Sequence, residues 1–167
     1  MRGVRAAVAT FLIATVVGAA AAGAATADEP PSGTSVPPRP GAALLRWIRT
    51  SGWRDSWTPE PHAHASAGPH GGRVRTWYNP TLVEDLASGR RPFRKDAAMV
   101  KALYGGGGKA SGWAVMRKVR DGKSAGTWWF FETTSGSLGD AVSGRGIEKC
   151  AGCHSAGRDY LRSRFRP

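Results

Sequence analysis

The sequence predicts an α+β fold that is mainly β: an antiparallel sheet of four to five strands, short flanking helices and a C-terminal helix. Three observations support this prediction. Residues 73–79 (RVRTWYN) and 112–119 (GWAVMRKV) have alternating side chains, with Val74, Thr76 and Tyr78 on one face and Arg73, Arg75 and Trp77 on the other in the first segment. Such alternation is typical of half-buried strands. Residues 127–134 (TWWFFETT) are aromatic and β-branched, and the Asp-Gly pair within 120–123 joins them to 112–119 as a hairpin.

The first 27 residues have the layout of a secretory signal peptide. Two arginines precede an uncharged run over about 6–22, and the small residues ATA (25–27) provide a site for cleavage after Ala27. The alternative is an N-terminal membrane anchor, for which the run is short of the ~20 apolar residues of a span. We therefore expect a periplasmic or secreted protein, with a Pro/Gly-rich tether over 28–41 and one domain over 42–167.

The charge of the chain narrows the class of partner. The net charge of +12 falls to +10 without the two N-terminal arginines, because all twelve acidic residues lie beyond the cleavage site. No dense Lys/Arg run is interleaved with aromatic residues, so we expect no nucleic-acid partner. An acidic redox partner, an anionic small molecule or an anionic envelope surface suits a basic exported protein better.

The first half of the domain begins with a helix and a loop. Residues 42–57 open with a short amphipathic helix, because Leu44, Trp47 and Ile48 fall at helical spacing. The turn-rich segment 58–72 (TPEPHAHASAGPHGG) is expected to be a loop that leads into the strand at 73–79.

The second half alternates strands with short connections. A short helix is expected over 81–88, with Thr81 as its cap. The periodicity of residues 97–104 (AAMVKALY) fits a helix or a strand, and we interpret them as a strand because GGGG follows at once and the neighbouring segments are strands. A Gly-rich loop over 135–146 precedes the final helix, which is expected from about Ile147 to Arg162 and includes CAGCH.

Cys150-Ala151-Gly152-Cys153-His154 holds both cysteines of the chain and has the C-x-x-C-H spacing of c-type haem attachment. On one helical turn, the two thiols can form thioethers with one haem, and the next residue, His154, becomes the proximal ligand of its iron. We therefore expect one haem c, bonded through Cys150 and Cys153.

The cysteine pair has three other interpretations: a zinc site, a redox pair of the thioredoxin type, or a disulfide. A zinc site needs four ligands, and the other histidines lie far upstream. A thioredoxin-like pair would be expected near a βαβ unit. A disulfide across two residues closes a loop too small to stabilise the fold much. Export, by contrast, delivers the chain to the compartment where c-type haem is attached.

The iron is expected to be five-coordinate. Residues 155–167 contain no Met, His or Lys, so a sixth ligand would come from upstream. An open position opposite His154 implies binding or catalysis with a small molecule rather than electron transfer alone. The strand segments exclude a four-helix cytochrome c′. The upstream residues able to ligate iron are Met99, Met116, His62, His64 and His70.

The order of several motifs resembles the cytochrome P-460 family, which includes the β-sheet cytochromes c′ (c′-beta). The resemblance runs from about Trp53 onward and implies an antiparallel sheet packed on a C-terminal haem, usually in a homodimer. One kind of member oxidises hydroxylamine and carries a further covalent bond from a lysine to the haem. The other lacks that bond and binds nitric oxide or similar gases. The motifs are HGGRVRTWYNP (70–80), MVKALY (99–104), WAVMRKV (113–119), GTWWFFE (126–132) and CAGCHSAGRDYL (150–161).

The resemblance gives three polar residues candidate catalytic roles. Lys101 stands where the haem-bonded lysine is sought, although it could also be a solvated lysine or pair with a haem propionate. Arg75 could face the haem edge or remain a surface charge, and Glu132 could exchange protons near the iron or form a strand-end ion pair. The chain departs from the family at Ala102, where an acidic residue is expected, and in the glycine tract 105–108.

Large apolar residues are candidates for the haem wall, with ordinary core packing as the alternative for each. They are Phe93, Trp113, Met116, Trp129 and Phe131. Three functions follow: oxidation of hydroxylamine or a related nitrogen compound, binding of nitric oxide without catalysis, or electron transfer by a six-coordinate haem.

Overall fold

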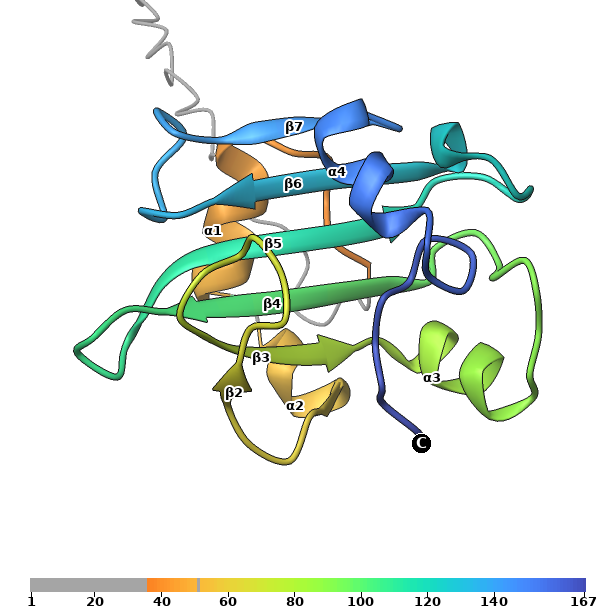
Figure 1. Cartoon of the computed structure of the whole chain (residues 1–167), viewed down its shortest axis with the longest axis horizontal. Coiled ribbons are helices and arrows are strands. Elements are labelled where there is room, and N and C mark those ends of the chain that lie inside the picture. Colours follow the sequence, from red (N-terminus) through yellow and green to blue (C-terminus); the bar gives the residue numbers. More distant parts are fainter. Residues whose placement is uncertain (1–35, 51) are drawn as a thin grey trace, which may run out of the picture.

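The computed structural model describes residues 36–50 and 52–167, which contain one antiparallel sheet of seven strands and a few short helices (Figure 1). The mainly β, antiparallel architecture predicted from the sequence is confirmed. The predicted signal peptide and residues 28–35 of the predicted tether lie outside the described residues. The sheet order is β1-β3-β4-β5-β6-β7, and β2 pairs with β3. The strands are β1 (Thr58–Pro59), β2 (His64–Ala65), β3 (Arg73–Tyr78), β4 (Ala98–Tyr104), β5 (Ala110–Lys118), β6 (Trp128–Thr133) and β7 (Val142–Arg145).

The four long strands are the ones expected from the sequence: alternation predicts β3 and β5, the aromatic run predicts β6, and the glycines that follow favour β4. β3, β4, β5 and β6 pair in chain order, so each strand lies beside the next. The additional strands were expected to be loops: β1 and β2 lie within 58–72, and β7 lies within 135–146. Each has two to four residues, too few for a sequence period, and exists because a long strand offers it unpaired backbone groups.

Two helices cover one face of the sheet. α1 (Ala42–Thr50) and α2 (Trp53–Ser56) lie behind the strands in Figure 1. Their tryptophans pack closely: the ring centroids of Trp47 and Trp53 are 5.5 Å apart, and those of Trp53 and Trp77 are 5.7 Å apart. This first core cluster also contains Val100, and such burial of large aromatic surface stabilises the attachment of the helices. Within the described residues, no helix is both long and apolar enough to cross a bilayer.

The other face carries α3 (Pro80–Ala87) and α4 (Glu148–His154). Asn79, not Thr81, caps α3: its Oδ1 accepts from the Leu82 amide at 3.0 Å, and Pro80 begins the helix. α4 ends at His154 rather than near Arg162 as predicted. The chain then turns sharply at Gly157, where an added Cβ would overlap the Leu161 carbonyl, so a continuous helix is not formed.

The residues preceding α1 that the structure describes contact the sheet. Pro37 is buried, and its carbonyl accepts a hydrogen bond from Arg117 at 2.7 Å. Pro38 and Pro40 line a small pocket with Leu44. The part of the predicted tether from residue 36 to 41 is therefore packed against the domain.

Candidate functional site

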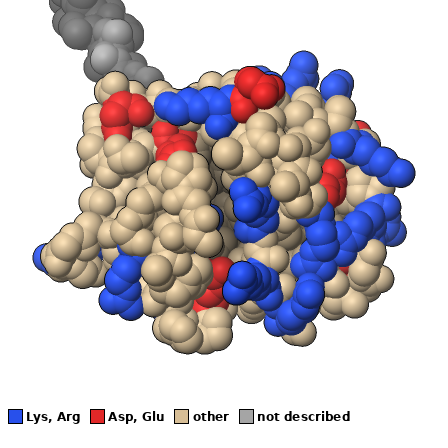
Figure 2. Space-filling model, in the orientation of Figure 1, with Lys and Arg blue, Asp and Glu red and all other residues tan. Residues whose placement is uncertain are grey.

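A cavity of about 770 Å³ lies on the face of the sheet that carries α4. Strands β3 to β6 form its floor, residues 64–70 form one wall, and α4 with residues 156–164 forms the other. In Figure 2 the molecule is hollowed between these walls, and basic side chains gather beside the hollow. The basic residues of the wall on the α4 side are Lys149, Arg158, Arg162 and Arg164.

α4 brings the C-x-x-C-H residues to this cavity. Cys150, Cys153 and His154 all line it, because positions three and four apart share one side of a helix. Both thiols are free, with Cys150 partly buried and Cys153 exposed. Partial burial raises the pKa of the Cys150 thiol. Two unpaired thiols and a histidine therefore border one large cavity.

His154 is held in a defined tautomer. Its Nδ1 lies 2.8 Å from the carbonyl oxygen of Tyr160, and a carbonyl only accepts, so Nδ1 carries the proton. The side chain is buried, and this desolvation lowers the pKa of the imidazole, which favours its neutral form. Its Nε2 forms no hydrogen bond with the residues that the structure describes. A histidine held in this way is prepared to bind a metal ion through Nε2.

The turn that supplies the Tyr160 carbonyl is anchored by a buried ion pair. Asp159 and Tyr160 have φ values of 47° and 66°, which are uncommon for residues other than glycine. The Asp159 carboxylate accepts from the fully buried Lys118 ammonium at 2.7 Å and from the Phe93 amide at 2.8 Å. Lys118 also donates to the Gly122 carbonyl, so both charges are paired. These contacts fix the backbone against which His154 is oriented.

A polar row crosses the floor of the cavity. Lys101 on β4 is opposite Ala114 on β5, which is opposite Glu132 on β6. All three line the cavity, and the small Ala114 side chain leaves space between the charged residues. Burial lowers the pKa of the Lys101 ammonium, so its neutral amine is more accessible than that of an exposed lysine. Two of the predicted catalytic residues, Lys101 and Glu132, are therefore brought together.

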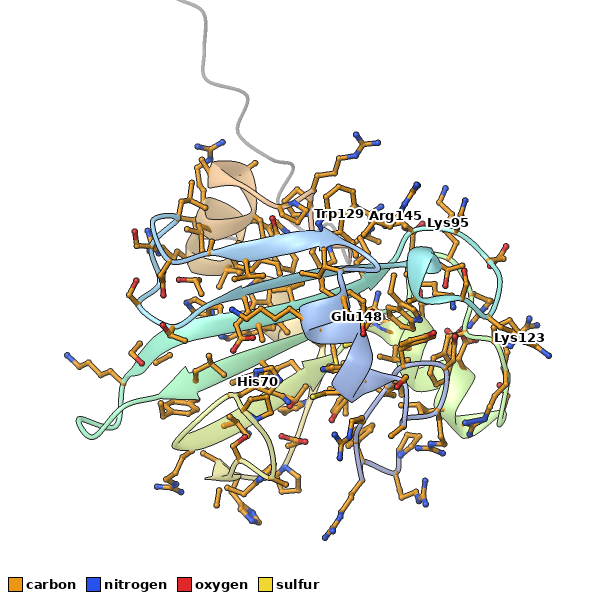
Figure 3. All side chains as sticks on the ribbon, turned by 45° about the horizontal axis from the view of Figure 1, so that its top comes forward. His70, Lys95, Lys123, Trp129, Arg145 and Glu148 are labelled. Carbon is orange, nitrogen blue, oxygen red and sulfur yellow. The ribbon has the colours of Figure 1, made fainter. Side chains whose placement is uncertain are left out.

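His70 is the partner of Glu132. Its Nδ1 lies 2.9 Å from Glu132 Oε1, and this hydrogen bond lowers the pKa of the carboxyl group. Figure 3 shows His70 over the sheet, beside α4. From the sequence, His70 was expected only as one of several residues able to ligate iron. Its hydrogen bond with Glu132 was not predicted. Its place between Pro69 and two glycines was the available signal for a turn back onto the sheet.

An apolar row lies beside the polar one. Met99 is opposite Met116, which is opposite Phe130, and all three line the cavity. Met116 and Phe131 were predicted at this wall and line the cavity, whereas Phe130 was missed and the predicted Trp129 does not line it. Strand alternation could have identified Phe130, because residues two apart share a face, as Phe130 and Glu132 do.

Several predicted wall residues belong to other parts of the fold. Phe131 borders the cavity but packs in the tryptophan-rich first cluster, which also contains Trp113. Trp129 lines the small pocket beside Leu44, and Figure 3 shows it well away from His70. Phe93 is buried in a second core cluster, which also contains Tyr78, Leu82 and Trp128, and it does not line the cavity.

Arg75 also lies outside the cavity lining. Its guanidinium donates to the Glu60 carbonyl at 2.9 Å and lies 5.2 Å from the centroid of the Trp77 ring. It therefore braces the segment after β1 rather than facing the haem edge or distal pocket as predicted. Glu60 instead lines the cavity, and its carboxylate accepts from the Thr76 amide and the Tyr78 hydroxyl.

The residues that line the cavity fit a haem c. The volume falls in the range of about 300–1,000 Å³ typical of small-molecule and cofactor sites. One guanidinium nitrogen of Arg158 is buried without a hydrogen-bond partner, at a wall where an anionic propionate would satisfy it. Within residues 36–50 and 52–167, no group of three or more His, Cys, Asp or Glu side chains is placed to hold a metal ion.

Comparison with known proteins gives no further identification. No family model matches the sequence, and no curated protein matches it significantly.

Proposed function

We propose that the chain is an exported mono-haem c-type cytochrome of the P-460 type that acts on small nitrogen compounds. Cys150 and Cys153 would hold the haem by thioether bonds, and His154 would be the proximal ligand. The observation that carries this proposal is the state of His154 beside the two free thiols: its Nδ1 donates to a carbonyl, and its Nε2 remains available on a cavity wall.

The cavity floor supplies groups for proton movement. A bound haem supplies an iron that binds a small nitrogen compound and exchanges electrons. Oxidation of hydroxylamine releases protons, and His70 can accept one at Nε2 while its Nδ1–H remains bonded to Glu132 Oε1, 2.9 Å away. Lys101, whose pKa is lowered by burial, can act as a neutral amine toward the haem or the substrate.

A second candidate function is the binding of nitric oxide or another gas without catalysis. The apolar row of Met99, Met116 and Phe130 favours it, because such a surface accepts small uncharged molecules without hydrogen bonds. The two functions differ in whether Lys101 is bonded to the haem and in whether hydroxylamine is consumed. Electron transfer by a permanently six-coordinate haem is the third alternative.

The experiment is a comparison of holoproteins made with c-haem maturation machinery. Wild type is expected to show hydroxylamine-dependent reduction of an electron acceptor and a ferrous Soret-type band well to the red of ordinary haem c. Lys101→Arg keeps the charge and removes the amine, so both signals should be lost, while Lys123→Arg on an exposed turn should preserve them. An ordinary c-type spectrum with nitric oxide binding and no turnover selects the gas binder.

The partner proposals follow from charge and from the family resemblance. A basic exported protein would exchange electrons with an acidic redox protein, and such encounters slow as ionic strength rises. A homodimer would be observed as twice the monomer mass in sedimentation equilibrium. A transfer rate that does not change with salt would contradict the acidic partner.

A further inference from the structure

The imidazoles of His70 and His154 line the same cavity, although the two residues are far apart in the sequence. The ring centroids of His70 and His154 are 6.3 Å apart, with 69° between the ring planes. Each ring uses Nδ1 in a hydrogen bond, His70 to Glu132 and His154 to the Tyr160 carbonyl. Neither Nε2 forms a hydrogen bond with any described residue. The two rings are therefore alike in chemical state: each has its Nε2 lone pair unused.

The spacing of the two rings matches that of two ligands on one metal ion. An imidazole nitrogen binds a first-row metal at about 2 Å, so imidazoles on opposite sides of one ion have ring centres about 6 Å apart. Rotation of one ring about the metal–nitrogen axis does not change this spacing, so a 69° angle between the planes is compatible with it. The same geometry also falls within the range of about 4.5–7 Å of an edge-to-face contact between two aromatic rings, so the unused Nε2 atoms and the test below distinguish the two.

Glu132 prepares His70 for this role. A carboxylate only accepts, so the proton of His70 is on Nδ1 and the lone pair is on Nε2. The same contact fixes the orientation of the ring, as second partners of metal-binding histidines do. His64, on the same loop, differs because its Nδ1 faces the Ala65 carbonyl and its Nε2 faces Glu60. Among the three histidines of this loop, His70 is the one that the geometry selects.

The segment around His70 is short and fastened on both sides. The Ser66 amide donates to the Gly72 carbonyl at 2.9 Å, and Gly72 packs so closely on the Tyr104 carbonyl that a Cβ would overlap it. Between these points, residues 67–69 are exposed, and Gly71 has open space around its Cα. The His70 ring can therefore move away by rearranging a few residues while the sheet remains intact.

We propose that His70 binds the haem iron through Nε2, opposite His154, in the resting protein, and that an incoming small nitrogen compound displaces it. This inference rests on the proposed function and changes the expected five-coordinate iron to a six-coordinate resting state. The exchange breaks one Fe–N bond and forms a bond from iron to the new ligand, and no electron is transferred. After displacement, His70 and Glu132 remain at the cavity as a proton-exchanging pair.

Displacement has a measurable consequence for ligand binding. The apparent affinity falls by the fraction of molecules whose site is open, so a resting state that is about 90% ligated by His70 weakens binding about tenfold. The observed rate of binding also levels off at high ligand concentration, because release of His70 then limits it.

The test uses the full-length holoprotein and carbon monoxide as the probe of the ferrous iron. Wild type is expected to have a low-spin, six-coordinate spectrum and a binding rate that saturates with carbon monoxide concentration. His70→Ala should be high-spin, with a rate that rises linearly and an affinity about tenfold or more higher. His62→Ala is the matched control, because His62 is exposed on the same loop and does not line the cavity.

The outcomes separate this inference from the proposal on which it rests. A covalent haem protein that is high-spin in both wild type and His70→Ala overturns the role of His70 and leaves the haem assignment intact. A low-spin spectrum that persists in His70→Ala also overturns it. A polypeptide without covalent haem overturns both. Restoration of the low-spin spectrum in His70→Ala by added imidazole supports ligation at this position.

Discussion

The ion pair between Lys118 and Asp159 is predicted to be a major determinant of stability. Lys118 has no exposed surface and Asp159 is 4% exposed, and their Nζ and Oδ2 atoms are 2.7 Å apart. Asp159→Ala leaves the ammonium with the Gly122 carbonyl as its remaining hydrogen-bond partner among the described residues. Removal of one partner of a buried pair costs about 3–5 kcal/mol, a large share of the ~5–15 kcal/mol by which domains are stable.

The measurement is the free energy of unfolding from urea titration of wild type, Asp159→Ala and the double variant Lys118→Met/Asp159→Ala. The double variant should recover part of the loss, because no unpaired charge then remains in the core. Glu84→Gln, which removes an exposed partner of Arg94, is the matched control and should be close to wild type. A loss below about 1 kcal/mol in Asp159→Ala, as for an exposed pair, would refute the reasoning.

Three further predictions concern the cavity and one loop. Met99→Leu and Met116→Leu should keep the wild-type spin state and lose less than about 1.5 kcal/mol of stability, since they conserve volume; a changed spin state would identify a methionine ligand. Arg158→Ala should lower the midpoint potential of the haem, because a positive charge beside a propionate favours the reduced iron; spectroelectrochemistry measures it, and a rise would contradict the placement. Asp140 accepts hydrogen bonds from Thr133, Thr134 and Ser135, which hold its pKa well below the usual range. Its folded-state pKa is depressed, so its contribution is complete above the unfolded pKa of about 4 and is lost as the pH falls below it. The stability difference between wild type and Asp140→Ala should therefore shrink in acid, and a difference that grows would contradict it.

The long strands could be predicted from local features of the sequence. Alternation in β3 and β5 is such a feature, as is the aromatic run of β6, whereas β4 was assigned from the glycines that follow it. β1 and β7 could not be found in the same way. Their few residues become strands because β3 and β6 offer unpaired backbone groups at the required distance, which depends on the assembled sheet.

The candidate site shows the same division between local and long-range information. The C-x-x-C-H spacing gives Cys150, Cys153 and His154 directly, and the structure places all three at one cavity. The partner of Glu132 could not be predicted, because His70 is 62 residues away, in a loop whose hydrophobic residues follow no regular pattern. The omission of Phe130 was avoidable, since Phe130 and Glu132 are two residues apart and must share a face of β6.

The burial of Lys118 and its ion pair with Asp159 also could not be predicted from the sequence. Lysine at the end of a strand is normally exposed, and the acidic residue nearest to Lys118 in the sequence, Asp121, is not its ion-pair partner. Asp159 is 41 residues away, in a turn that forms because α4 stops after His154. The contact that anchors the His154 region thus depends on the whole fold.

Covalent attachment of haem through both cysteines is the central claim, and the intact mass of the purified protein tests it most directly. The full-length chain should be produced with c-haem maturation machinery, beside a known c-type cytochrome as a loading control. The expected intact mass is that of the processed polypeptide plus one haem. Digestion should release a haem peptide that contains Cys150 and Cys153. Cys150→Ala/Cys153→Ala should have the mass of the polypeptide alone. A wild-type mass without haem, while the control is fully loaded, would contradict the account.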